Sequence, residues 1–221
     1  MGSEMCIRDR YLNEYFSEMT KVALEQGATI DKYIGDAMMV FFGDPESKGE
    51  REDARACVEM ALRMQERMEE LREKWLNEGF ADPFQIRIGL NTGYCNVGNF
   101  GSDQRLTYTI IGGEVNVAAR LESAAEANGI LMSYETYAHV QDMVEVEQKE
   151  AIKMKGINRE IKIFNIINRK SKISKKMPRK NKKAPSNTAN VTQDSDRLSK
   201  LEKNISKLTN IVNELKKGLE K

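Results

Sequence analysis

The sequence predicts an α+β domain in which helices cover one face of a mainly antiparallel sheet. Three observations support this class. Residues 28–43 have the pattern of a β-hairpin, residues 50–78 carry apolar side chains at helical spacing, and residues 84–92 alternate apolar with polar side chains. A chain of 221 residues with 40% hydrophobic content is long enough for one such domain plus extra segments.

The hairpin is the best-defined element. Its first strand covers Thr29 to Ile34, its return strand covers Met38 to Phe42, and Gly35-Asp36 forms the tight turn. The carboxylate of Asp36 is therefore placed at the hairpin tip. Taken locally, this pattern favours a solvated turn, because Gly-Asp turns are common.

Two amphipathic helices flank the hairpin. The predicted helix at residues 11–26 is followed by Gly27, a typical helix end. Residues 50–78 carry a buried stripe from Ala54 to Trp75, in which we expect the methionines to fill the core. Residues 1–10 show no periodicity or cap that leads into the first helix. We therefore interpret them as a non-native-looking leader.

The second half of the chain continues with short strands and helices. Residues 93–102 and 105–111 predict a glycine-rich hairpin rather than a phosphate loop, because no Gly-Lys-Ser/Thr follows. The remaining predicted elements are a helix at 114–127, a strand at 130–133, a short helix at 136–143, and strands at 144–154 and 160–167 with Lys155-Gly156 in the turn between them.

Two further segments follow the domain at residues 11–168. Residues 169–197 predict a flexible basic linker, since Arg169 to Lys183 holds nine Lys or Arg and no acid. Its lack of interleaved aromatics argues against nucleic acid, and it offers at most weak contact with a membrane surface. Residues 198–221 have the heptad pattern of a parallel two-stranded coiled coil, or alternatively form one helix docked on its own domain.

The cysteines and apolar runs bear on the compartment. Cys6, Cys57 and Cys95 have neither the number of a disulfide scaffold nor metal-ligand spacing, which favours a reducing setting. The apolar runs fall far short of the roughly 20 residues of a membrane span. We expect a cytoplasmic protein, or one on the cytoplasmic side of a membrane if spans lie upstream.

Four stretches identify a resemblance. GATIDKYIGDAMMVFFG, NTGYCNVGNFGS, RLTYTIIGGEVNVAARLES and MKG occur in the order of a class III nucleotidyl cyclase catalytic domain, and the resemblance covers about residues 11–168. The resemblance implies a ferredoxin-like βαββαβ core whose first strand, with its metal-binding Asp-Ile pair, is absent here; Asp9 precedes Arg10 and does not match. We therefore expect little or no activity from this chain alone.

The resemblance also implies a site shared by two domains paired head to tail, in which ATP is converted to 3′,5′-cyclic AMP with two Mg²⁺ or Mn²⁺ ions. A Lys donor suits adenine N1, an acceptor, whereas guanine calls for a carboxylate. By motif, Asp36 binds metal, Lys32 and Thr109 select the base, Asn116 and Arg120 orient the ribose and offset phosphoryl charge, and Lys155 and Arg105 contact the triphosphate.

Local reasoning leaves other interpretations open. Arg120 lies one helical turn after Asn116 and, without the resemblance, pairs with Glu122 or Glu126 or stays in solvent. The sequence Gly-Gly-Glu before this helix also departs from the Gly-Asp-Thr of many cyclases. Two alternative functions remain: a guanylate cyclase, disfavoured by Lys32, and a catalytically inactive dimerisation or regulatory module.

Overall fold

A computed structural model of the chain falls into two units, Met1–Lys172 and Ile173–Lys221. It describes residues 2–153 and 160–170, all of which belong to the first unit. Three predicted features lie outside the described residues: Lys155 in its turn, most of the basic linker and the coiled-coil helix.

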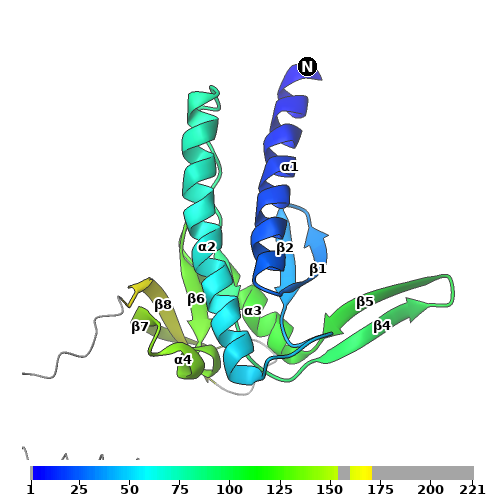
Figure 1. Cartoon of the computed structure of the whole chain (residues 1–221), viewed down its shortest axis with the longest axis vertical. Helices are drawn as coiled ribbons and strands as arrows, with labels where there is room; N and C mark the ends of the chain where they lie inside the picture. The colour runs from blue at the N-terminus through cyan, green and yellow to red at the C-terminus, as the bar shows by residue number, and fades with distance from the viewer. Residues whose placement is uncertain (1, 154–159, 171–221) are drawn as a thin grey trace, which may run out of the picture. The chain divides into compact units, whose positions relative to one another are not determined.

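The described part of the chain alternates helices and strands in close agreement with the predicted order (Figure 1). The elements are α1 (Gly2–Glu25), β1 (Thr29–Ile34), β2 (Ala37–Phe41), α2 (Glu50–Asn77), β3 (Ile88–Leu90), β4 (Asn96–Ser102), β5 (Arg105–Ile111), α3 (Gly113–Ala124), β6 (Ile130–Ser133), α4 (Tyr134–Val140), β7 (Val144–Lys153) and β8 (Glu160–Arg169).

Most element boundaries lie within three residues of the prediction, and the starts of α1 and β3 differ by more. α1 begins at Gly2 instead of residue 11. The intervening stretch holds no proline and includes the good helix formers Glu4, Met5, Arg8 and Arg10, so the helix continues back from its packed part. β3 is shorter than the predicted strand at 84–92. Phe84 and Ile86 pack against the core around α1 and α2 instead.

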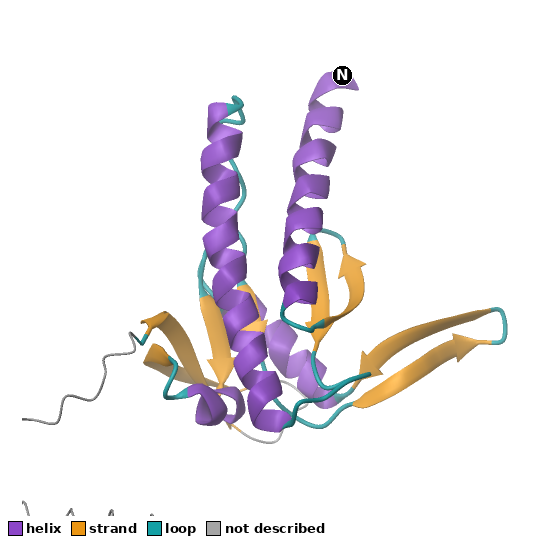
Figure 2. Cartoon of the chain, viewed as in Figure 1, coloured by secondary structure: helices purple, strands orange, loops and turns teal. Residues whose placement is uncertain are grey.

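The first core lies between α1, α2 and the β1–β2 hairpin, which are neighbours in space (Figure 2). The indole of Trp75 is fully buried, and its Nε1 donates a hydrogen bond to Glu14 Oε2 at 2.9 Å, so its polar atom is satisfied. The prediction that methionines fill the core is confirmed. Buried here are Tyr11, Tyr15, Met19, Met60, Met64, Met68 and Leu71.

The main sheet has four strands in the order β3-β6-β8-β7, with β3 parallel to β6 and the other pairs antiparallel. Met132 of β6 packs in a core with α2 and α4, while its neighbour Leu131 packs in a separate core with α3. Because successive side chains of a strand point to opposite faces, helices cover both faces of this sheet. The expectation that helices lie on one face is therefore wrong.

The β4–β5 hairpin is a separate two-stranded sheet that extends away from the helices in Figure 1, and we call it the arm. Its strands pair from Asn96 with Ile111 at the base to Ser102 with Arg105 at the tip. This confirms the predicted glycine-rich hairpin. Among the described helices, none is long and apolar enough to cross a membrane.

Gly89 lets β3 approach α3 closely. A Cβ atom at this position would lie 2.3 Å from the carbonyl oxygen of Ala118 and 2.3 Å from the backbone nitrogen of Glu122. Since backbone atoms cannot move aside, we predict that Gly89→Ala lowers the free energy of unfolding by about 3 kcal/mol, measured by urea titration. The matched control is Gly113→Ala at the start of α3, where a Cβ meets nothing within 4 Å. Equal stability of the two variants would contradict this packing.

Burial raises the pKa of the Cys57 thiol from 9.0 to about 12. The folded state therefore keeps its proton in a pH range where the unfolded chain loses it, and stability falls as pH rises from 9 towards 12. We predict a loss of about 1.4 kcal/mol per pH unit in this window from Cys57. Thermal unfolding between pH 8 and 10 should show a flatter slope in Cys57→Ala, and an unchanged slope would refute the assignment.

Candidate active site

Two of the predicted site residues meet in the structure although they lie far apart in the sequence. Lys32 on β1 donates from Nζ to the Oγ1 atom of Thr109 on β5 at 2.9 Å. The Thr109 residue is buried, with 7% of its surface exposed, whereas 42% of the Lys32 side chain is exposed. The pair therefore presents an accessible cation beside a buried hydroxyl.

Asp31 completes this contact and was missed by the sequence analysis. Its Oδ2 atom accepts a hydrogen bond from Thr109 Oγ1 at 2.8 Å and another from the backbone nitrogen of Ile110 at 3.4 Å. Lys32 Nζ lies 3.4 Å from Oδ1, and the Asp31 side chain is fully buried. We call Asp31, Lys32 and Thr109 the base triad, because Lys32 and Thr109 are the residues that the sequence analysis expects to select the nucleotide base.

A β-bulge allows this arrangement. Ile30 pairs with Val40 and Lys32 pairs with Met39, so Asp31 is the extra residue of the bulged strand. In a regular strand Asp31 and Lys32 would point to opposite faces, but a bulge redirects a side chain and both reach Thr109. Two consecutive polar residues inside an otherwise apolar strand were the signal for this bulge in the sequence.

Asp36 lies in the turn after Gly35, whose φ of +64° suits glycine, and its side chain is exposed. Burial, with smaller contributions from the Asp36 carboxylate and Tyr33, raises the pKa of Tyr15 to about 12. Among the described residues, no group of three His, Cys, Asp or Glu side chains is placed to hold a metal. The Asp36 carboxylate by itself is therefore not a complete metal site, and its role as a metal ligand stays a prediction.

The other predicted pair lies on α3. Asn116 and Arg120 are both exposed, and Arg120 has no hydrogen-bond or ion-pair partner in the part of the chain that the structure describes. Glu122, which was one of its alternative partners, pairs with Arg87 at 3.0 Å instead.

The start of α3 is held from β3. Asn91 Nδ2 donates to the backbone oxygen of Glu114 at 3.0 Å and to its Oε2 at 2.8 Å. The altered Gly-Gly-Glu sequence thus still leads into a helix that begins at Gly113.

One copy of the chain does not gather all predicted residues. Within the described ranges, no recorded hydrogen bond or ion pair joins the base triad to Asp36, Asn116 or Arg120. Arg105 is exposed at the tip of the arm, and Lys155 lies outside the described residues.

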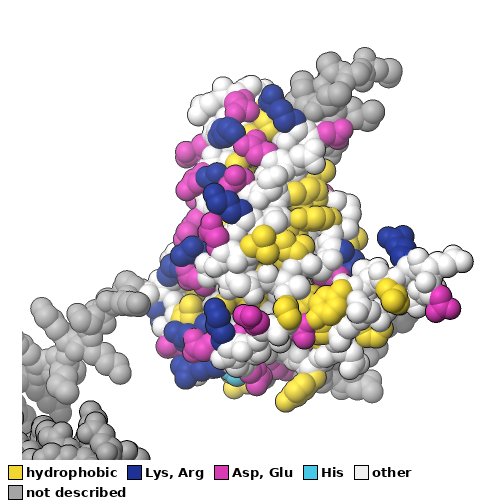
Figure 3. Space-filling model, turned by 45° about the vertical axis from the view of Figure 1, so that its right-hand side comes forward, with side chains coloured by type: hydrophobic (Ala, Val, Ile, Leu, Met, Phe, Trp, Pro, Cys, Tyr) yellow, Lys and Arg dark blue, Asp and Glu magenta, His cyan; other side chains and the backbone are white. Residues whose placement is uncertain are grey.

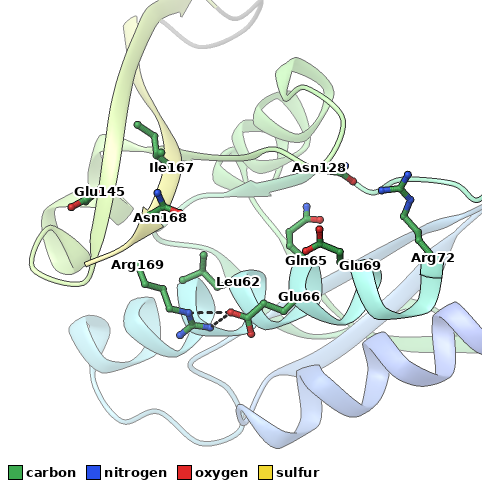
Figure 4. A pocket seen from close by; sticks show the side chains of 10 residues that line it. All are labelled: Leu62, Gln65, Glu66, Glu69, Arg72, Asn128, Glu145, Ile167, Asn168 and Arg169. Atoms are coloured by element: carbon green, nitrogen blue, oxygen red, sulfur yellow. Dashed lines mark hydrogen bonds and ion pairs between the residues drawn. The ribbon is translucent and has the colours of Figure 1, made fainter. Parts of the chain in front are cut away.

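A pocket of about 590 Å³ opens elsewhere, between α2 and the end of β8 (Figure 4). On its wall Arg169 pairs with Glu66 at 3.1 Å, which joins β8 to α2. None of the predicted site residues that lie within the described ranges lines it. The lining residues are Leu62, Gln65, Glu66, Glu69, Arg72, Asn128, Glu145, Ile167, Asn168 and Arg169.

Large apolar side chains are exposed near the base triad, on β1 and along the arm. Figure 3 shows one face of the molecule. Hydrophobic side chains gather on one part of it, and charged side chains are concentrated along the left of the view. The exposed large apolar residues of β1 and the arm are Tyr33, Ile34, Phe100, Leu106, Tyr108 and Ile111. Strand alternation divides those of the arm between its two faces, and exposed apolar surface of this kind favours contact with another molecule.

A comparison with known protein families shows which family this chain belongs to. The model of the adenylate and guanylate cyclase catalytic domain matches residues 4–168. The chain belongs to this family. It is thus a class III nucleotidyl cyclase domain, as the four sequence motifs predict.

Solved structures of cyclases have the same fold as this cyclase domain. The adenylyl cyclase CyaB from P. aeruginosa is 48% identical with a TM-score of 0.72, covering 76% of this chain and 85% of that one. The guanylyl cyclase Cya2 is 32% identical with a TM-score of 0.68, covering 75% and 82%.

Two curated relatives are named adenylate cyclases. Adenylate cyclase 1 of Rhizobium meliloti is 32% identical over 158 residues, which are 71% of this chain and 23% of that protein. An adenylate cyclase of Anabaena cylindrica is 28% identical over 165 residues, covering 71% and 32%. The cyclase domain thus spans about a quarter to a third of the length of these relatives.

The absence of a recorded partner for Arg120 in the described residues predicts that the folded cyclase domain does not need this side chain. Arg120→Ala should change the free energy of unfolding by less than about 0.5 kcal/mol in a urea titration. Arg87→Ala, which removes a surface ion pair with Glu122, serves as the comparison and should cost up to about 1 kcal/mol. A loss of several kcal/mol in Arg120→Ala would mean that the guanidinium is structural.

Proposed function

We propose that this cyclase domain is an adenylate cyclase that converts ATP to 3′,5′-cyclic AMP and pyrophosphate. The observation that carries the proposal is the exposed ammonium of Lys32 held against Thr109. An ammonium is a donor without acceptor capacity. It therefore complements adenine N1, which accepts, and opposes guanine N1, which carries a hydrogen.

The names of the relatives add independent support. CyaB is called an adenylyl cyclase and is 48% identical, whereas Cya2 is called a guanylyl cyclase and is 32% identical. Both curated relatives described above are also named adenylate cyclases. Guanylate cyclase activity remains the second candidate because of the likeness to Cya2.

The remaining roles follow the motif matches. In the reaction the ribose 3′ oxygen bonds to the α-phosphorus as the bond to pyrophosphate breaks. The Asn116 amide would orient the ribose, and the Arg120 guanidinium would offset the charge that develops on the phosphoryl oxygens. Lys155 and Arg105 would contact the triphosphate.

A bound Mg²⁺ or Mn²⁺ ion would supply Lewis acidity that favours loss of the proton from the attacking hydroxyl. Of the chain's own residues we assign Asp36 as a ligand. Because the described residues supply no complete site, we derive no step through the metal.

We further propose that the active site forms between two copies arranged head to tail. Among the described residues, no recorded hydrogen bond or ion pair joins the base triad to the exposed pair on α3 in one copy, and β1 and the arm, which carry the triad, expose large apolar side chains. A second copy would cover that apolar surface and bring its own Asn116 and Arg120 to the nucleotide. The predicted parallel coiled coil would assist this pairing.

The free thiols Cys57 and Cys95 support a reducing compartment, and we propose the cytoplasm.

Nucleotide selectivity tests the proposal. Isothermal titration of the full chain with ATP or GTP, each with Mn²⁺, should show at least about tenfold tighter binding of ATP, the difference that one reversed hydrogen bond produces. Lys32→Glu should abolish that preference. Lys162→Glu on β8 makes the same charge change outside the base triad and should retain it.

Two results would contradict the proposal, and each would favour a different function. Tighter binding of GTP by the unaltered chain would favour a guanylate cyclase. Binding of neither nucleotide would favour the inactive dimerisation or regulatory module.

A further inference from the structure

We propose that Asp31 determines base specificity by fixing the Thr109 hydroxyl as a hydrogen-bond acceptor. This inference rests on the proposed function and concerns the same base triad. Asp31 is a positioning residue, since it acts through Thr109 and its buried side chain does not itself reach solvent.

The argument begins with the polarity of the hydroxyl. A threonine hydroxyl has one hydrogen to donate and two lone pairs that accept, so by itself it suits either an amine or a carbonyl. Beside Asp31 this freedom is lost. The carboxylate Oδ2 lies 2.8 Å from Thr109 Oγ1 and has no hydrogen, so the hydroxyl hydrogen must point to Asp31.

The second neighbour of the hydroxyl reinforces this polarity. Lys32 Nζ lies 2.9 Å from Thr109 Oγ1 and donates to one of its lone pairs. One lone pair remains, and it accepts. The exocyclic amine of adenine can donate a hydrogen bond to this lone pair. The O6 carbonyl of guanine has only lone pairs of its own to present and cannot form a hydrogen bond here.

The surroundings of Asp31 hold it in the acceptor role. The backbone nitrogen of Ile110 also donates to Oδ2, and the Lys32 ammonium lies 3.4 Å from Oδ1. Each recorded partner of this carboxylate is therefore a donor. The bulge that inserts Asp31 into β1 is the backbone feature that aims it at Thr109.

A purely structural alternative makes a different prediction. In that case Asp31 only ties β1 to β5, and its replacement lowers stability and weakens all nucleotides alike. In the positioning role, replacement changes the ratio of the ATP and GTP affinities. The ratio of the ATP and GTP affinities therefore distinguishes a structural role of Asp31 from a positioning role.

Asp31→Asn is the decisive variant, because its amide can donate to Thr109 and release the hydroxyl hydrogen. Titration of the full chain with Mn²⁺-ATP and Mn²⁺-GTP should show the ATP preference falling about tenfold. In a Thr109→Val background the same replacement should leave the ratio unchanged. Asp142→Asn, at a surface carboxylate paired with Arg55, is the matched control and should retain the full preference.

A measurement on the unaltered chain covers the case in which Asp31→Asn does not fold. Purine riboside triphosphate lacks a group at position 6, and 6-methoxypurine riboside triphosphate presents an acceptor there, while both keep N1 as an acceptor for Lys32. A hydroxyl fixed as acceptor predicts that the methoxy compound binds about tenfold more weakly than the unsubstituted one, and that Thr109→Val reduces this difference.

The possible failures are distinguishable. If the unaltered chain binds neither ATP nor GTP, the proposed function fails and this inference fails with it. If it prefers ATP while Asp31→Asn keeps the full preference, or if the two purine analogues bind equally, the role of Asp31 is refuted and the adenylate cyclase proposal stands.

Discussion

Two side-chain hydrogen bonds to Thr109 connect strands that have no backbone ladder between them. β1 pairs with β2 and β5 pairs with β4, and these are separate sheets. The hairpin and the arm are therefore joined at this point through Asp31 and Lys32, both of which contact Thr109. A buried carboxylate is tolerable here because Oδ2 accepts two hydrogen bonds and the Lys32 ammonium lies 3.4 Å from Oδ1, which accepts no hydrogen bond within the described residues.

This constraint links the packing to the chemistry. The α1 and α2 core supports one face of the hairpin, which holds β1 in place. α3 is fixed independently, by the close approach of Gly89 and by the hydrogen bonds from Asn91 to Glu114. The two sets of proposed nucleotide contacts are thus built on separately packed parts of the domain. This arrangement suits a site that is completed by pairing two copies.

Much of the fold was predictable from the sequence, because period-two and helical patterns mark most elements and glycine marks several of their ends. The hairpin at β1 and β2, the long helix α2 and the arm follow directly from such patterns. The location of α3, on the face of the main sheet opposite to α2 and α4, could not be predicted in this way. Both faces of β6 and β8 are apolar, so the sequence pattern does not indicate on which face each helix packs.

The site was predicted in part. The family motif assigned Lys32 and Thr109 to the same predicted role, selection of the nucleotide base, and the structure brings them within hydrogen-bonding distance. Asp31 escaped notice because strict strand alternation places it on the far face from Lys32, and only the bulge reverses that. Lys155 lies outside the described residues, and the roles of Asp36, Asn116, Arg120 and Arg105 stay predictions.

The central claim is that the base triad reads adenine. A crystal structure of the full chain with an ATP analogue and Mn²⁺ tests it most directly. The account predicts Lys32 Nζ at hydrogen-bonding distance from adenine N1 and Thr109 Oγ1 at hydrogen-bonding distance from the exocyclic amine, with the Thr109 bond to Asp31 retained. An adenine bound away from the triad, or a triad that opens when nucleotide binds, would contradict it.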